Sequence, residues 1–179
     1  DGAGTIEAIG ENVTGLSAGQ RVTYGNGPMG SYCQSRLMPA KNVLALPDGI
    51  EYQTAAAMMV KGMTAQYLIR QCYDVKAGDT ILVQAVAGGV GLILCQWAKH
   101  LGATVIGTVS TEEKAELARS YGCDHTINYT TEDFAKRVRE ITNDEGVPVA
   151  YDGVGASTFE GSIDSLRTRG TLVGYGNAS

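Results

Sequence analysis

Residues 80–100 read TILVQAVAGGVGLILCQWAKH, an apolar run followed by a glycine-rich turn and then by apolar residues at helical spacing. The run predicts a buried strand, and the stretch from Gly91 predicts a helix. In the turn between them, Gly88 would let a backbone approach a pyrophosphate, and Gly91 would permit close packing of the helix on the strand. Val86 replaces the first glycine of the G-x-G-x-x-G pattern, so the motif alone does not establish a phosphate site.

The alternation of strand and helix continues along the rest of the chain. Strands are predicted at 104–109, 125–129, 147–152 and 171–175, and helices at 111–121, 132–141 and 158–166. Apolar strands that alternate with amphipathic helices indicate an α/β fold, a doubly wound parallel sheet of the Rossmann type. Ser110 and Glu113 form a predicted capping box for one helix. A complete fold of this type has six strands, so we expect an internal piece of a longer enzyme.

Residues 1–50 have a different texture, with short runs separated by turn residues. They predict strands at 5–9, 21–24, 32–38 and 43–46, which indicates an antiparallel β piece. Two helical runs follow, at 55–60 and 64–71. We therefore expect two regions, a β region at 1–50 and a dinucleotide-binding domain at 51–179 that is incomplete at its C-terminal end.

The second strand of this domain indicates which dinucleotide would bind. NAD sites usually carry an acid at the end of this strand, whereas this chain has Ser110 there. Lys114 lies one helical turn further on, and Tyr129 ends the third strand at the same edge. The missing acid and the available cation favour NADPH over NADH. The alternative is that Lys114 is a solvated helix residue, and the neighbouring Glu112 and Glu113 weaken the case for a phosphate.

The strands of the second half end at the same edge of the sheet, across the crevice where ligands bind in such folds. The residues placed to contact the nicotinamide half are Gly153, Val154, Tyr175, Gly176 and Asn177. Asp152 precedes them, and we interpret it as a buried hydrogen-bonding residue of a turn and not as a catalytic group.

Composition excludes several classes of function. Lys and Arg number 14 against 19 Asp and Glu, and no basic cluster is present, so no nucleic-acid partner is expected. The longest uncharged, weakly polar stretch, 85–95, is about half of the ~20 residues that a membrane helix needs, so no membrane association is expected. The cysteines form no C-x-x-C pair and are separated by 23 to 39 residues, unlike the short ligand spacings of structural zinc, which predicts no metal site and indicates reduced thiols in the cytoplasm. They are Cys33, Cys72, Cys95 and Cys123.

Several ordered motifs give the whole chain a resemblance to a known family. They are GAGTIEAIGENVTGLSAGQRV from residue 2, LPDGI from 46, KGMTAQYL from 61, AVAGGVGL from 85, AKHLGA from 98, INY from 127, YDGVG from 151 and GNAS from 176. With these motifs the chain resembles the zinc-independent, ζ-crystallin-like quinone oxidoreductases of the medium-chain dehydrogenase/reductase superfamily. The resemblance implies a GroES-like β domain before the cofactor domain, and reduction of a quinone or an activated alkene by NADPH.

The resemblance also implies roles for individual residues. The phosphate-binding positions match Ser110, Lys114 and Tyr129, and the glycine loop matches Gly88, Gly89 and Val90. The nicotinamide side matches Thr64, Gly153 and Tyr175. No catalytic residue and no metal ligand is implied within this chain, because the cofactor is itself the hydride donor. Members of the family commonly form homodimers.

Three alternative functions remain open. A relative of the zinc-dependent alcohol dehydrogenases would need a cysteine-rich lobe, and the direct link from Gly27 to Tyr32 leaves no room for one. A non-catalytic, crystallin-type protein that binds NADPH would carry the same cofactor motifs. A hydrolase is suggested only by G-x-S-x-G at 15–19, and a strand-like run follows this motif where a nucleophile elbow requires a helix.

Overall fold

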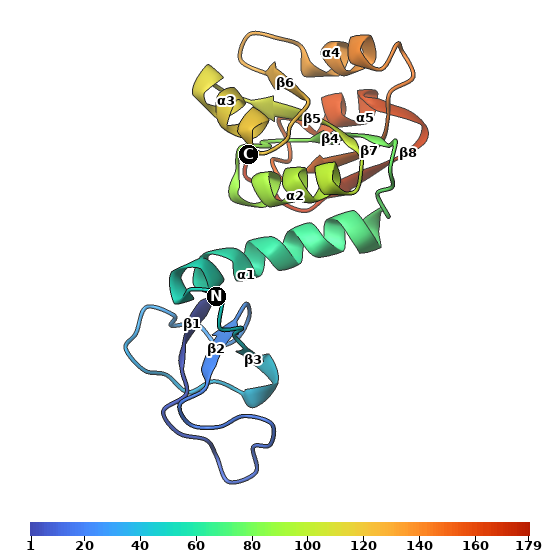
Figure 1. The fold of residues 1–179 in the computed structure, drawn as a ribbon. Helices are drawn as coiled ribbons and strands as arrows, with labels where there is room; N and C mark the ends of the chain where they lie inside the picture. The colour runs from blue at the N-terminus through green and yellow to red at the C-terminus, as the bar shows by residue number, and fades with distance from the viewer. The chain divides into compact units, whose positions relative to one another are not determined.

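The computed structural model describes residues 1–179, which form two compact units, Asp1–Met63 and Thr64–Ser179 (Figure 1). The first unit contains a small antiparallel sheet with the order β1-β2-β3. Its strands are β1 (Gly2–Thr5), β2 (Arg21–Tyr24) and β3 (Leu44–Ala45), and a short 3₁₀ helix (Ala40–Asn42) precedes β3. The predicted antiparallel β piece is confirmed, although β1 begins earlier than the predicted strand at 5–9.

The predicted strand at 32–38 was wrong. This segment is a loop. The Arg36 guanidinium donates hydrogen bonds to the main-chain oxygen of Pro28 at 2.5 Å and to the hydroxyl of Tyr24 at 3.1 Å. An alternating pattern makes a strand only where a neighbouring strand accepts its main-chain groups, and the segment has no such neighbour in the small sheet.

The two predicted helices at 55–60 and 64–71 form one continuous element. Helix α1 (Tyr52–Tyr67) runs directly into a π-helical turn, Leu68–Cys72. Gly62 lies in the interior of α1 and does not end it, because a glycine costs only about 1 kcal/mol of helix stability relative to alanine. Leu68 and Ile69, beyond the end of α1, are fully buried in the second unit.

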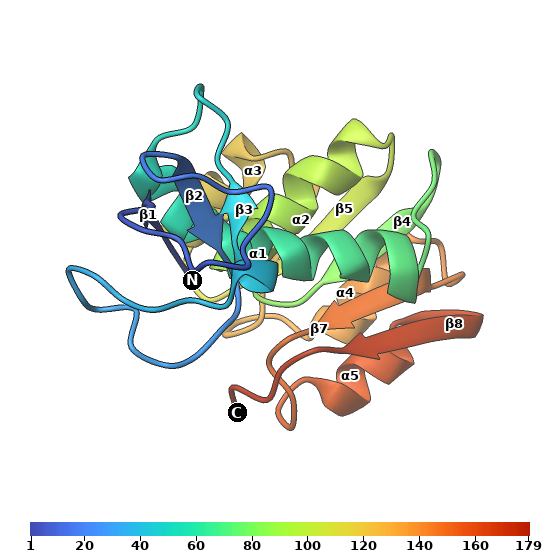
Figure 2. The same cartoon turned by 90° about the horizontal axis from the view of Figure 1, so that it is seen from below.

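The second unit is built around a parallel sheet with the order β6-β5-β4-β7-β8 (Figures 1 and 2). Its strands are β4 (Thr80–Val83), β5 (Thr104–Val109), β6 (His125–Asn128), β7 (Val147–Asp152) and β8 (Leu166–Gly174). Its helices are α2 (Gly89–His100), α3 (Glu112–Ser120), α4 (Phe134–Ile141) and α5 (Phe159–Asp164). The predicted α/β fold with a doubly wound parallel sheet is confirmed.

Both faces of this sheet are covered, because alternate residues of each strand point to opposite sides. Ile81 and Val83 of β4 pack in one cluster with Leu94 of α2. Leu82, between them, packs in a second cluster with Val138 of α4. Figure 1 shows α2 on one side of the sheet and α4 and α5 on the other. Continuous apolar strands are the consequence of this double burial.

The strand order reverses between β4 and β7, which are direct neighbours in the sheet. From β4 the chain moves outward through β5 to β6, and it then crosses back to β7 and continues to β8. The loops that follow β4 and β7 therefore leave the sheet side by side in opposite directions. A crevice at the carboxyl end of such a switch point is where ligands bind in open α/β sheets.

Candidate functional site

The loop between β4 and α2 forms the first part of the site. Gly88 is the N-cap of α2, no side chain caps the helix, and its first turn has no acidic residue. The N–H groups of the first turn have no acceptor within the helix, and they lie at the positive end of the helix dipole. Gly91 is required for packing, because a Cβ there would lie 2.5 Å from the main-chain oxygen of Val86. The loop therefore presents N–H donors that suit an anion.

Val86, at the position of the missing glycine, does not obstruct this loop. Its side chain is completely buried, and it belongs to the core cluster beneath the sheet's α2 face. Gly107 of β5 makes the room, because a Cβ at Gly107 would collide with the Val86 side chain. The larger residue is thus accommodated on the core side of the loop, and it does not line the small cavity beside the loop.

Ala85 begins the loop in a left-handed conformation, with φ of 51°. Non-glycine residues seldom adopt this conformation, and it persists where the surroundings hold it. The Ala85 N–H donates to the hydroxyl of Thr108 on β5 at 3.0 Å, and that hydroxyl donates to Oε1 of Gln84 at 2.6 Å. Gln84 and Thr108 are both 1% exposed. A buried pair of polar side chains therefore sets the start of the glycine loop.

A small cavity of about 140 Å³ lies next to this loop. Its lining contains four of the residues that the sequence predicts to bind the cofactor: Gly88, Ser110, Lys114 and Tyr129. Lys114 Nζ donates a hydrogen bond of 3.0 Å to Ser110 Oγ, so the ammonium group is held at the cavity. The remaining lining residues, which the sequence did not indicate, are Ala85, Ala87, Thr108 and Val109.

The predicted capping box of α3 was wrong. The N-cap is Thr111, whose hydroxyl accepts the Lys114 N–H at 3.3 Å. Ser110 therefore does not cap the helix, and its hydroxyl accepts a hydrogen bond from the Lys114 ammonium instead. The acidic neighbour Glu112 pairs with Arg119, its side chain is 72% exposed, and it does not line the cavity. The local charge at the cavity is consequently that of the Lys114 ammonium.

The loop after β7 forms the second part of the site. The carboxylate of Asp152 is 3% exposed, and its Oδ1 accepts the N–H groups of Val154 at 2.9 Å and Gly155 at 3.0 Å. Hydroxyl groups of Thr158 and Ser162 also donate to this carboxylate. The interpretation of Asp152 as a buried hydrogen-bonding residue of a turn is confirmed.

The predicted nicotinamide-side residues that follow β7 and β8 pack closely. A Cβ on Gly153 would lie 2.7 Å from the ring of Tyr175, and a Cβ on Gly176 would lie 2.5 Å from the Gly153 oxygen. A Cβ on Gly155 would lie 3.1 Å from the Cα of Asn177. Burial raises the pKa of Tyr175 to about 12, with a further contribution from Asp152, so the phenol is neutral at physiological pH.

Residues 89–179, just over half of the chain, match the sequence profile of the family described as zinc-binding dehydrogenase. The chain belongs to the zinc-binding dehydrogenase family. The resemblance to quinone oxidoreductases of this superfamily is likewise confirmed by individual relatives. The quinone oxidoreductase of Pseudomonas aeruginosa is 51% identical over 179 residues, which are 100% of this chain and 55% of that protein. The 2-haloacrylate reductase of a Burkholderia species is 51% identical over 181 residues, with 100% and 54% coverage.

Solved structures of the dehydrogenase family agree with the fold. The quinone oxidoreductase of Escherichia coli in complex with NADPH superimposes with a TM-score of 0.97 at 44% identity, covering 99% of this chain and 54% of that one. The quinone oxidoreductase of Pseudomonas syringae gives a TM-score of 0.96 at 51% identity, with 98% and 54% coverage. The chain thus spans about half the length of the curated relatives that it matches.

The family's name implies zinc, and the residues of this chain do not fit a zinc site. No group of three or more His, Cys, Asp or Glu side chains is arranged to hold a metal ion. All four cysteines are free thiols. The G-x-S-x-G motif at 15–19 also lacks the setting of a nucleophile elbow, because no helix follows it. No helix of this dehydrogenase-family chain is long and apolar enough to cross a membrane.

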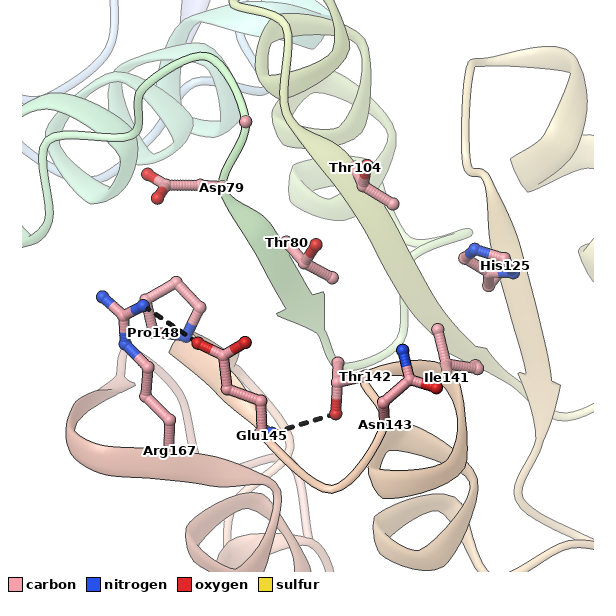
Figure 3. A pocket seen from close by; sticks show the side chains of 12 residues that line it. Asp79, Thr80, Thr104, His125, Ile141, Thr142, Asn143, Glu145, Pro148 and Arg167 are labelled. Atoms are coloured by element: carbon pink, nitrogen blue, oxygen red, sulfur yellow. Dashed lines mark hydrogen bonds and ion pairs between the residues drawn. The ribbon is translucent and has the colours of Figure 1, made fainter.

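A larger cavity of about 310 Å³ opens at the opposite edge of the sheet, around the amino ends of its strands (Figure 3). Thr80, Thr104 and His125 line it from β4, β5 and β6. Its charges include an ion pair of 3.7 Å between Arg167 and Glu145. Helix α4 ends there at Ile141, so the negative end of the helix dipole faces the cavity. The larger cavity also contains the carboxylates of Asp79 and Glu145, and its Arg167 guanidinium is already paired with Glu145. The small cavity has a lysine and no carboxylate, and it is therefore the candidate site for a dinucleotide phosphate.

Eight of the twelve residues predicted for the cofactor line neither cavity: the five nicotinamide-side residues that follow β7 and β8, and also Thr64, Gly89 and Val90. Gly89 begins α2, and Val90 is half-buried against the core beneath that helix. Thr64 lies in α1 and is half-buried. Thr108, the lining residue that orients the loop, was detectable in principle, because a polar residue within an otherwise apolar strand needs a buried partner.

Proposed function

We propose that this chain is part of an oxidoreductase that transfers hydride from NADPH to a quinone or an activated alkene. The observation that carries the proposal is the cavity beside the glycine loop, where Ser110 holds the Lys114 ammonium at a site without a carboxylate. A cation and hydroxyl groups suit the 2′-phosphate that distinguishes NADPH from NADH. The names of the relatives, quinone oxidoreductase and 2-haloacrylate reductase, support the class of acceptor.

In this proposal, three groups of residues bind three parts of the cofactor. Gly88, Gly89 and Val90 would hold the pyrophosphate, and Ser110, Lys114 and Tyr129 the 2′-phosphate. The nicotinamide side would be formed by Thr64, Gly153, Val154, Tyr175, Gly176 and Asn177. When bound, the cofactor supplies the hydride, and the protein orients it and excludes water. We assign no catalytic residue within this chain for that reason.

The wider organisation is part of the same proposal. Residues 1–50 would be part of a GroES-like β region of the catalytic domain, and residues 51–179 would belong to an NADP-binding domain. We further propose that the whole protein acts on a small molecule as a homodimer in the cytoplasm. The free cysteines support a reducing compartment.

The cofactor assignment is tested by titrating the full-length protein with NADPH and NADH, alongside a Lys114→Ala variant. Loss of a charge-assisted hydrogen bond to a phosphate weakens binding by about tenfold or more, so the Kd for NADPH should rise by that factor. The Kd for NADH should change by less than about twofold, since that cofactor has no 2′-phosphate. Lys136→Ala, on the exposed side of α4, is the matched control and should change neither value.

The assignment is wrong if the unmodified protein binds NADH as tightly as NADPH and Lys114→Ala alters neither. Turnover is tested separately by following NADPH oxidation with 1,4-benzoquinone and with an α,β-unsaturated carbonyl compound. We expect acceptor-dependent oxidation with one of them. Tight NADPH binding without oxidation by either acceptor would support a non-catalytic, crystallin-type role instead.

A further inference from the structure

A continuous chain of hydrogen bonds joins the two loops of the proposed cofactor site through the interior of the protein. It begins where the Ala85 N–H donates to Thr108 Oγ1 at 3.0 Å and Thr108 donates to Gln84 Oε1 at 2.6 Å. Gln84 Nε2 then donates to Ser162 Oγ at 3.0 Å. The Ser162 hydroxyl donates to Asp152 Oδ2 at 2.8 Å. Each side chain in the chain both donates and accepts until the carboxylate ends it.

The four side chains that form this series of hydrogen bonds are buried, with exposed fractions between 0% and 3%. They are Gln84, Thr108, Ser162 and Asp152. Burial of polar groups costs free energy unless every group is satisfied, and apolar residues of similar size would fill the same space without that requirement. Burying this series of polar side chains therefore costs free energy, and the need to fill the core does not explain why they are there. Its path suggests what the groups do instead.

The two ends of the chain lie at the two loops that the switch point separates. Ala85 opens the glycine loop after β4, and the Asp152 carboxylate holds the N–H groups of Val154 and Gly155 after β7. Gln84 lies between the two loops. Its main-chain N–H donates to the main-chain oxygen of Tyr151, on the neighbouring strand, at 2.9 Å. A shift of one loop relative to the other would stretch bonds in a medium of low polarity, where they are strong.

We propose that Gln84 and Ser162 are positioning residues that fix the spacing between the two loops, so that one dinucleotide meets both in a single geometry. The proposal rests on the proposed NADPH function and names the residues that act on it without touching the cofactor. A site with its halves fixed in advance loses less entropy when a ligand spans it. Ligands that occupy only one half gain nothing from the spacing.

This difference provides a test in the full-length protein with two ligands, NADPH and adenosine 2′,5′-bisphosphate, which represents the adenosine half alone. Ser162→Ala interrupts the chain in its middle. We expect its Kd for NADPH to rise about tenfold, the effect of one hydrogen bond to a charged network. The Kd for adenosine 2′,5′-bisphosphate should change by less than about twofold.

Ser165→Ala is the matched control, because Ser165 is also fully buried but its hydroxyl donates only to the Gly161 oxygen at 2.7 Å. It should leave both Kd values unchanged. Gln84→Leu interrupts the chain at other bonds and leaves the Ser162–Asp152 contact in place, so it should reproduce the Ser162→Ala result. Urea unfolding of each variant verifies that it is folded.

The positioning role is overturned if Ser162→Ala and Gln84→Leu raise the Kd for both ligands by the same factor, or change neither. A merely structural role would lower stability and leave the ratio of the two Kd values as it was. If the unmodified protein binds neither ligand, the proposed function itself fails, and this outcome is distinct from an unchanged ratio.

Discussion

The hydroxyl of Thr108 accepts the main-chain N–H of Ala85 at 3.0 Å, and it thereby holds a non-glycine residue at φ 51° at the start of the glycine loop. The left-handed conformation costs an alanine about 1–2 kcal/mol relative to glycine. One hydroxyl on β5 thus stabilises the loop that departs from β4.

Thr108→Val should lower the free energy of unfolding by about 1–3 kcal/mol, because the isosteric side chain leaves the buried Gln84 Oε1 without a donor and the part-buried Ala85 N–H without an acceptor. Urea unfolding measures the change. Thr104→Val, on the same strand but half-buried and without a side-chain hydrogen bond, should change the free energy by less than about 0.5 kcal/mol. Equal effects of the two substitutions would contradict the role of the hydroxyl.

Gly107→Ala should destabilise the second unit by about 1–3 kcal/mol, since the added Cβ would collide with Val86 and lie 2.9 Å from the Cys123 sulfur. Thermal and urea unfolding both report this loss. Gly174→Ala on β8 is the control, because nothing lies within 4 Å of a Cβ there. The Gly107→Ala, Val86→Ala double variant should recover part of the loss, and strictly additive effects would exclude the proposed collision.

Asp124 should contribute a pH-dependent part of the stability. Burial raises its pKa, but the hydrogen bond from Lys99 and the 2.9 Å hydrogen bond from the Val105 N–H outweigh burial, so the pKa lies below its ordinary value. A lowered folded-state pKa stabilises the protein above the unfolded value of about 3.9, and this contribution is lost as pH falls through the folded-state pKa.

Asp124→Asn should therefore lower the free energy of unfolding at pH 7 by about 1–2 kcal/mol. The difference between the variant and the unmodified protein should shrink below about pH 4, as urea unfolding at a series of pH values would show. Asp74→Asn, which affects an exposed pair with Arg70, should have an effect below about 1 kcal/mol. A difference for Asp124→Asn that persists unchanged at pH 2 would disprove the assignment.

The four thiols should divide into two classes toward iodoacetamide. Cys33 and Cys72 are exposed, whereas Cys95 and Cys123 are buried in the core. The hydrogen bond with Cys95, together with burial, raises the pKa of the Cys123 thiol, so this group stays protonated and unreactive. Mass spectrometry of the folded protein should show two rapid modifications, and four after unfolding in urea. Rapid modification of Cys95 or Cys123 in the folded protein would contradict the burial.

The sequence predicted the second unit well because its signals are local and repeated. Strands β5 and β7 have the predicted bounds, since apolar runs between turn residues leave little freedom. The small sheet was predicted less well. The segment 32–38 alternates like a strand, and its structure depends on the long-range hydrogen bonds of Arg36 with Pro28 and Tyr24. Helix α1 was predicted as two separate runs, 55–60 and 64–71, because propensity alone does not decide whether neighbouring helical turns continue.

At the candidate site, the end of β5 was likewise predicted in part. The sequence placed Ser110 and Lys114 at a strand end and one helical turn beyond it, and chain geometry alone makes them neighbours. It assigned the wrong residue to the N-cap, because Ser110 and Thr111 are both good caps and only the backbone conformation selects Thr111.

Local sequence signals are sufficient to predict the α/β fold, the order of its strands and helices along the chain, and the glycine loop at the first strand–helix junction. These features follow from periodicity and turn chemistry, which act over a few residues. Two features became visible in the packed structure alone. Val86 turns into the core opposite Gly107, and one series of hydrogen bonds links Gln84, Thr108, Ser162 and Asp152. These contacts join residues far apart in sequence, and their geometry depends on the register of packed strands, which no local pattern specifies.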